Sequence, residues 1–187
     1  MSNENPWKTV GSKVVYENQW ITVREDQVIR PDGAAGIYGV VETRIATGVV
    51  ALSEDNQIYL VGQYRYPIET YSWEIVEGGA ESETPLEAAQ RELQEEAGLL
   101  AAKWTQLGEE VHLSNCVSAE VGVLFLAKEL STVAPNPDGT EVLALRKVPF
   151  SEAVAMVDNG EITDAMSIIG ILRAEKLLGP VGGVTHE

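Results

Sequence analysis

The chain has 187 residues, of which 44% are hydrophobic and 22% are charged, and its formal net charge is −16. That length allows one well-developed core with a small accessory element, and no apolar run approaches the ~20 residues of a membrane span. The acidic balance argues against a nucleic acid as the main partner, because binding its backbone requires clustered lysine and arginine.

The first 44 residues predict an antiparallel β segment, with strands over Ser12–Glu17, Trp20–Arg30 and Gly36–Arg44. The residues at 31–33, Pro-Asp-Gly, supply the turn between the last two strands. The segment also carries more aromatic surface than three strands bury by themselves. These aromatic residues are Trp7, Tyr16, Trp20 and Tyr38.

The segment Glu83–Leu99 predicts a well-capped helix. Thr84 is a good N-cap, Pro85 suits the first helical position, and Glu87 completes a capping box. Gly98 is the residue expected just past the C-terminus. Apolar residues at helical spacing predict a stripe that faces the core. They are Leu86, Ala89, Leu93 and Ala97.

Three glutamates form an acidic cluster on this helix. At about 100° per residue, Glu92 and Glu96 fall on one side of the apolar stripe, and Glu95 lies further round. We expect no cation on the same face to offset them, and each like-charge pair then costs roughly 0.2–0.5 kcal/mol. Because hard divalent cations take oxygen ligands, the cluster predicts a site for Mg²⁺, or for Mn²⁺ as a substitute. A solvated acidic face is the alternative.

The rest of the chain predicts further strands and two late helices, at Ser151–Asp158 and Asp164–Leu178. Strands around a central helix, followed by a helical pair, predict an α/β protein built as an α/β/α sandwich. The expected strands are Gly48–Leu52, Ile58–Tyr64, Ser72–Val76, Trp104–Val111, Val121–Ala127 and Glu141–Val148.

The lone cysteine, Cys116, cannot form an internal disulfide, which fits a reducing cytoplasm. The N-terminus also lacks the basic and apolar regions of a signal peptide, so we expect a cytoplasmic protein. We interpret Cys116 as a buried, inert side chain, with a nucleophilic pair between Cys116 and His112 as the alternative.

The acidic helix and the loop before it resemble the Nudix box: a glycine, five residues, Glu, seven residues, then Arg-Glu-apolar-x-Glu-Glu-x-Gly-apolar. One departure is that four residues, not five, separate Gly78 from Glu83. The resemblance implies a Nudix sandwich with a mixed sheet over residues 45–180, between a β segment at 1–44 and a tail at 181–187. The matching residues are Glu83, Arg91, Glu92, Leu93, Glu95, Glu96, Gly98 and Leu99, preceded by Gly78 and Gly79.

Residues 63–67 (QYRYP) and 72–79 (SWEIVEGG) resemble a strand pair of ADP-ribose and nucleotide-sugar pyrophosphatases. This resemblance implies that Arg65 faces the phosphates of the substrate. It also implies that the backbone carbonyl of Glu77 binds metal, with no role for its side chain. The plain alternative for Arg65 is a surface arginine that pairs with a nearby acid.

Two loops complete the site that the resemblance implies. The loop before the last strand places Glu141 as a late metal ligand or base, with Asp138 as the fallback. Ser118 and Glu120 match a loop that shapes the pocket beyond the diphosphate, although residues 115, 116 and 119 depart from its pattern. We expect substrate contacts from Arg65, Gly78, Gly79, Ser118 and Glu120.

The implied activity is Mg²⁺-dependent hydrolysis of nucleoside diphosphate sugars, of the ADP-ribose, ADP-glucose or GDP-mannose type, to a nucleoside monophosphate and a sugar phosphate. A bound water attacks one phosphorus, Arg91 and Glu83 hold the loop against the helix, and exchanged N-terminal strands make a homodimer. The residues expected to hold metal are Glu92, Glu95, Glu96, Glu141 and the Glu77 carbonyl.

Two alternative functions remain at this stage. A ligand-sensing regulator with a Nudix fold would show a damaged Arg-Glu-x-x-Glu-Glu core or an added DNA-binding domain, and the sequence has neither. A nucleoside triphosphate sanitising pyrophosphatase would ordinarily lack the N-terminal strands. The base and the sugar of the substrate stay open.

Overall fold

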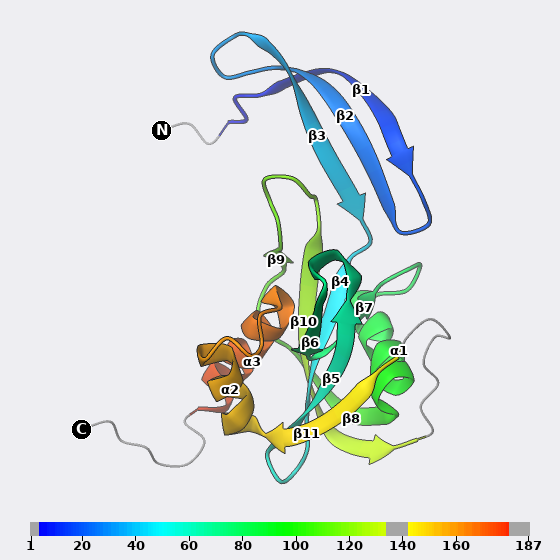
Figure 1. The fold of residues 1–187 in the computed structure, drawn as a ribbon, viewed down its shortest axis with the longest axis vertical. Helices are drawn as coiled ribbons and strands as arrows, with labels where there is room; N and C mark the ends of the chain where they lie inside the picture. The colour runs from blue at the N-terminus through cyan, green and yellow to red at the C-terminus, as the bar shows by residue number, and fades with distance from the viewer. Residues whose placement is uncertain (1–3, 134–141, 180–187) are drawn as a thin grey trace, which may run out of the picture. The chain divides into compact units, whose positions relative to one another are not determined.

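The computed structural model describes residues 4–133 and 142–179. The chain divides into two compact units, coloured along the chain in Figure 1. One comprises the chain up to Arg44 together with His112–Val121, and the other comprises Ile45–Val111 and the chain from Gly122 on. Residues 112–121 therefore group with the N-terminal strands, although the sequence analysis assigned them to the second domain.

The N-terminal unit is an antiparallel sheet in the order β1-β2-β3, with β1 at Lys8–Glu17, β2 at Ile21–Ile29 and β3 at Ala35–Thr43. Residues 117–119 bind the free edge of β3, because the Val41 amide donates to the Val117 carbonyl and the Ala119 amide donates to the Val41 carbonyl, both at 2.9 Å. The N-terminal β segment is thus confirmed, and a loop from the later chain extends it.

The second unit contains a mixed sheet in the order β11-β5-β4-β10-β8, with β6 paired to β5, β7 to β4 and β9 to β10. The β4–β10 pair is parallel, and the pairs that β4 forms with β5 and β7 are antiparallel. A short 3₁₀ helix at Tyr66–Ile68 joins β5 to β6. The strands are β4 Ala46–Leu52, β5 Gln57–Arg65, β6 Thr70–Glu74, β7 Val76–Gly79, β8 Leu99–Gln106, β9 Val111–His112, β10 Val121–Thr132 and β11 Ala144–Pro149.

Helices cover both faces of this sheet (Figure 1). Helix α1 at Pro85–Ala97 packs Ala89, Leu93 and Ala97 into a cluster with β4, β5 and β10. Helix α3 at Ala165–Leu178 packs on the other face, and α2 at Phe150–Asp158 contacts α3. The predicted α/β/α sandwich is confirmed. None of the helices among the described residues is long and apolar enough to cross a membrane.

The caps predicted for α1 are present. The Thr84 hydroxyl accepts from the Glu87 amide, the Glu87 side chain accepts from the Thr84 amide, and Gly98 adopts a positive φ of 62°. One member of the predicted stripe differs, since Leu86 is exposed at the first turn, and Ala88 is buried instead.

Two strands differ from their predicted positions. The expected strand at 72–76 is divided at Ile75, because β6 pairs with β5 whereas β7 pairs with β4. Strand β8 begins directly after Gly98 and ends at Gln106, before Gly108 turns the chain at a φ of 77°. The strand predicted at Trp104–Val111 therefore lies five residues earlier in the structure.

Candidate active site

A cradle for a carboxylate forms where β7 meets α1. A Cβ atom on Gly78 would lie 2.0 Å from the carboxylate of Glu92, so a glycine is needed for this side chain to lie against the strand. On the neighbouring strand β4, the Thr47 hydroxyl donates a hydrogen bond to the Gly78 carbonyl at 3.2 Å, which helps to fix the position of β7. The glycine of the box therefore has a direct steric role.

Arg91 joins the carboxylates to the loop before the helix. Its Nη1 donates to Glu92 at 2.7 Å and to Glu95 at 2.9 Å, and its Nη2 donates to Glu83 at 2.9 Å and to the Gly79 carbonyl at 3.0 Å. The prediction that no nearby cation offsets the glutamates was wrong. Arg91 and Glu95 lie four residues apart and therefore face each other on the helix, and the flexible arginine side chain also reaches its neighbour Glu92.

The ion pair between Arg91 and Glu83 shifts the pKa of both groups. Burial opposes the charge of Arg91, but hydrogen bonds to Glu83 and Glu95 outweigh it and raise the pKa of the guanidinium. The hydrogen bond from Arg91 lowers the pKa of Glu83. Arg91 and Glu83 are therefore both charged at neutral pH.

Glu96 lies on the buried side of α1, with 8% of its surface exposed. Its Oε2 accepts a hydrogen bond from the backbone amide of Glu77 at 3.3 Å. Within residues 4–133 and 142–179, no three acidic, histidine or cysteine side chains already form a metal-binding group. Glu92 and Glu95 are instead turned toward Arg91.

Arg65 pairs with Glu74, a carboxylate that is only 2% exposed. The Nε of Arg65 lies 3.0 Å from both carboxylate oxygens, and Nη2 also bonds Oε2. Burial opposes the charge of Arg65, but the bond to Glu74 outweighs it and raises the pKa. The structure thus shows Arg65 in the ion pair that the sequence analysis gave as its plain alternative.

The side chain of Glu77 points to α3, away from α1, and meets residues that sequence reasoning missed. Its Oε1 accepts from the Ser167 hydroxyl at 2.9 Å. Burial, then the neighbouring carboxylates of Asp164 and Glu74, raise the pKa of Glu77 well above its usual value. No local pattern in the sequence predicts this contact, because Ser167 lies 90 residues downstream of Glu77.

Of the remaining predicted site residues, two belong to the N-terminal unit and two lie outside the described residues. Ser118 and Glu120 belong to the N-terminal unit, where the Glu120 amide donates to the Ser118 hydroxyl at 3.4 Å. Glu141 and Asp138 lie outside the described residues.

Cys116 is exposed, so the prediction of a buried cysteine was wrong. It lies in the loop that binds the edge of β3, and its carbonyl accepts from the Tyr38 hydroxyl at 3.0 Å. The loop is held through its backbone, which leaves the thiol outside any core.

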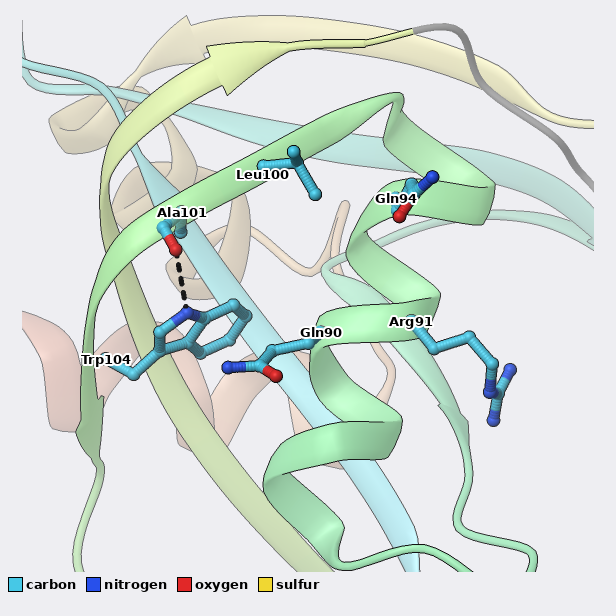
Figure 2. A pocket seen from close by; sticks show the side chains of 6 residues that line it. All are labelled: Gln90, Arg91, Gln94, Leu100, Ala101 and Trp104. Carbon is cyan, nitrogen blue, oxygen red and sulfur yellow. Dashed lines mark hydrogen bonds between the residues drawn. The ribbon is translucent and has the colours of Figure 1, made fainter.

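A pocket of about 260 Å³ lies between α1 and β8 (Figure 2). The Trp104 ring forms one wall, and its Nε1 donates to the Ala101 carbonyl at 3.1 Å. Gln90 and Glu92 are about 200° apart on a helix, so the pocket opens on the side of α1 away from Glu92. Its lining residues are Gln90, Arg91, Gln94, Leu100, Ala101 and Trp104.

Two family models match the chain. One described as NUDIX domain matches residues 42–166. One described as nucleoside diphosphate sugar hydrolase N-terminal domain matches residues 7–41. The two matches divide the chain near the junction of the two compact units.

Individual proteins are similar over most of the chain. The ADP-ribose pyrophosphatase of Mycobacterium tuberculosis is 31% identical over 173 residues, which cover 90% of this chain and 83% of the relative. The ADP-ribose pyrophosphatase of Bacillus subtilis (strain 168) is 30% identical over 167 residues, covering 88% and 90%. A crystal structure described as an ADP compounds hydrolase has a TM-score of 0.82 over 95% of this chain and 97% of its own, at 19% identity, and supports the fold.

Proposed function

The chain belongs to the NUDIX family, and from that premise we propose that it hydrolyses the diphosphate bond of nucleoside diphosphate sugars, with ADP-ribose as the first candidate. The products are a nucleoside monophosphate and a sugar phosphate. One observation carries the proposal: the Glu92 carboxylate occupies the space that Gly78 leaves open, while Glu96 meets the adjacent amide of Glu77. The carboxylates of Glu92 and Glu96 thus lie against neighbouring residues of β7.

The residues present fit a divalent cation. Glu92, Glu95 and Glu96 offer hard oxygen donors beside β7, and the Glu77 carbonyl belongs to the same strand. Members of the family use divalent metal ions, and we propose Mg²⁺ here, with Mn²⁺ as a substitute. Such an ion neutralises phosphate charge and lowers the pKa of a bound water.

Arg91 divides its hydrogen bonds between two tasks. Its Nη2 holds Glu83 and the Gly79 carbonyl, whereas its Nη1 holds Glu92 and Glu95. Release of the Nη1 bonds alone would remove the Arg91 contact from both carboxylates while the loop stays attached. We therefore assign Arg91 and Glu83 to the scaffold of the site.

Arg65 would bind the diphosphate in this scheme. Its bonds to Glu74 use Nε and Nη2, so the guanidinium is held in one orientation. Among the described residues Nη1 makes no hydrogen bond, and we propose that it binds a phosphate oxygen. We also propose that Gly78 and Gly79 contact the substrate through their backbone, because the side-chain space at Gly78 is taken by Glu92. Ser118 and Glu120 would contact the group beyond the diphosphate.

A carboxylate from the loop before β11 completes the catalytic group. We propose Glu141 as the late metal ligand or base, with Asp138 as the fallback. Glu141→Gln should lower kcat about 10²–10⁴-fold, the scale of a general-base step, while Asp138→Asn changes little. The reverse result would reassign the role to Asp138.

The active form is proposed to be a cytoplasmic homodimer. The lone cysteine supports a reducing compartment. The N-terminal sheet exposes large apolar side chains, including Tyr16 at 55%, Trp20 at 65% and Ile37 at 69%. A second copy of the chain would cover them.

The proposal is tested with a panel of ADP-ribose, ADP-glucose, GDP-mannose, UDP-glucose and nucleoside triphosphates, each with Mg²⁺. For the nucleotide sugars, phosphatase treatment after the reaction releases phosphate from the monoester products, and this phosphate is measured. For the triphosphates, whose terminal phosphate a phosphatase would also remove, the nucleoside monophosphate is measured directly instead. We expect turnover of at least one nucleotide sugar and its loss in chelator. Turnover of triphosphates alone would support a sanitising enzyme instead, and no turnover of any compound would support a ligand-sensing protein.

A further inference from the structure

Ser167 is a completely buried hydroxyl on the first turn of α3. Its Oγ accepts a hydrogen bond from the Ile75 amide at 3.0 Å and donates one to Glu77 Oε1 at 2.9 Å. Asp164, the N-cap of the helix, accepts from the Ser167 amide at 2.7 Å. The hydroxyl is thus fixed by its own helix and committed to two partners on the sheet.

Both partners lie where the sheet is interrupted. Ile75 separates β6, which pairs with β5, from β7, which pairs with β4. Its amide therefore bonds a side chain at the point where the chain changes partner strand. Gly170 allows α3 to come close, because a Cβ atom there would lie 3.1 Å from the Ile75 side chain.

The same three-residue segment is held from the other face by α1. The amide of Glu77 donates to Glu96 Oε2 at 3.3 Å, while the side chain of Glu77 bonds Ser167. Residues 75–77 are therefore clamped between one buried hydroxyl and one carboxylate of the acidic helix. A shift of this segment moves the Glu77 backbone and the Glu96 carboxylate together.

We infer that Ser167 is a positioning residue for the cation site, which it serves by fixing the start of β7 so that the Glu77 backbone and Glu96 face the same ion. This rests on the proposed function. Groups that orient metal ligands from behind typically contribute about 10–100-fold to metal affinity or activity. Ser167 reaches the ligands through the backbone, from the opposite face of the sheet.

The test measures Mn²⁺ binding to the full-length protein without substrate, by electron paramagnetic resonance of the free ion. Ser167→Ala should weaken binding about 10–100-fold. With a turned-over nucleotide sugar, kcat should fall on the same scale while KM changes less. Ile171→Val is the matched control, because Ile171 is fully buried on the same helix and should lose thermal stability without altering Mn²⁺ affinity.

The possible outcomes distinguish a failure of the positioning role of Ser167 from a failure of the proposed function. If Glu96→Gln weakens Mn²⁺ binding but Ser167→Ala behaves like Ile171→Val, the positioning role is overturned and the proposed function stands. Unchanged binding in Glu96→Gln overturns both. If Ser167→Ala does not fold, Ser167→Cys takes its place, because a thiol has similar shape and is only a weak donor.

Discussion

The two compact units of this chain bury their side chains in opposite ways. The unit that carries α1 contains a continuous apolar core on both faces of its sheet, and its charged network is closed by Arg91. Among the described residues of the N-terminal unit, only Asp26 and Val28 are buried. Six of its large apolar side chains are more than half exposed: Val10, Val14, Val15, Tyr16, Trp20 and Ile37.

This difference shows what each unit still requires. A sheet without a buried face is marginal in water, so the N-terminal unit requires a cover, for which we propose a second copy of the chain. The other unit already has its packing, and we propose that it binds a cation and a substrate. Changes in the α1 unit should therefore affect catalysis, and changes in the N-terminal unit should affect assembly.

The largest effect is expected at the acidic helix. Glu96→Gln keeps the shape and removes a mostly buried charge, so kcat should fall about 10²–10³-fold, the scale for loss of one charge-stabilising group. Thermal unfolding in chelator should be unchanged or improved, because the burial of an anion is relieved. Glu54→Gln, at an exposed turn, is the control and should leave both unchanged. Full activity of Glu96→Gln would contradict the proposed site.

The same substitution, glycine to alanine, can be made in each unit and its effects compared. Gly78→Ala would push the flexible Glu92 side chain out of its cradle, so kcat should fall about 10–100-fold with little change in unfolding temperature. Gly39→Ala in β3 should change neither, because no atom lies within 4 Å of the added Cβ. Equal kinetics in the two variants would show that the cradle has no catalytic role.

The exposed apolar face offers a test of assembly. Tyr16 and Ile37 lie on the same face of the N-terminal sheet by its strand register. Changing both to serine should shift the mass measured by light scattering from a dimer toward the 20.3 kDa monomer. Leu177→Ser, at an exposed position of α3 in the other unit, should keep the dimer. A double variant that remains dimeric would place the interface elsewhere.

The smallest effect is a pH dependence within the N-terminal sheet. Hydrogen bonds from Ser12 and Arg24 lower the pKa of Asp26 below its usual 3.8. A carboxyl group with a lowered folded-state pKa stabilises the protein above its unfolded pKa, and this stabilisation is lost as the pH falls through the folded value. Asp26→Asn should therefore unfold at a lower temperature than the wild type at pH 7, with the gap closing below about pH 4. A gap that stays constant with pH would contradict this account.

Local signals were enough to predict the central helix. Thr84, Pro85, Glu87 and Gly98 specify its ends through their own backbone and side-chain chemistry, so the caps in the structure match the sequence. The division at Ile75 depends on which strands pair with β6 and β7. Pairing is a tertiary choice that alternation of side chains does not encode.

The sequence indicated which types of residue belong to the candidate site, but it indicated few of the contacts that they make with one another. Spacing along the helix singled out Glu92, Glu95 and Glu96, and their role in metal binding stays a prediction. The same spacing places Arg91 four residues before Glu95, so this ion pair could have been predicted from the sequence. The contact between Ser167 and Glu77 joins residues far apart in sequence and has no local pattern. The exposure of Cys116 depends on a loop that docks onto β3, which is again a tertiary contact.

The most direct test of the central claim is product analysis with ADP-ribose and Mg²⁺ in ¹⁸O-labelled water, by mass spectrometry. Hydrolysis of the diphosphate bond predicts a nucleoside monophosphate and a sugar phosphate in equal amounts, with one ¹⁸O atom in the phosphate group of one product. Glu96→Gln should form both products far more slowly. Release of free ribose with intact ADP, or intact ADP-ribose beside hydrolysed nucleoside triphosphates, would contradict the claim.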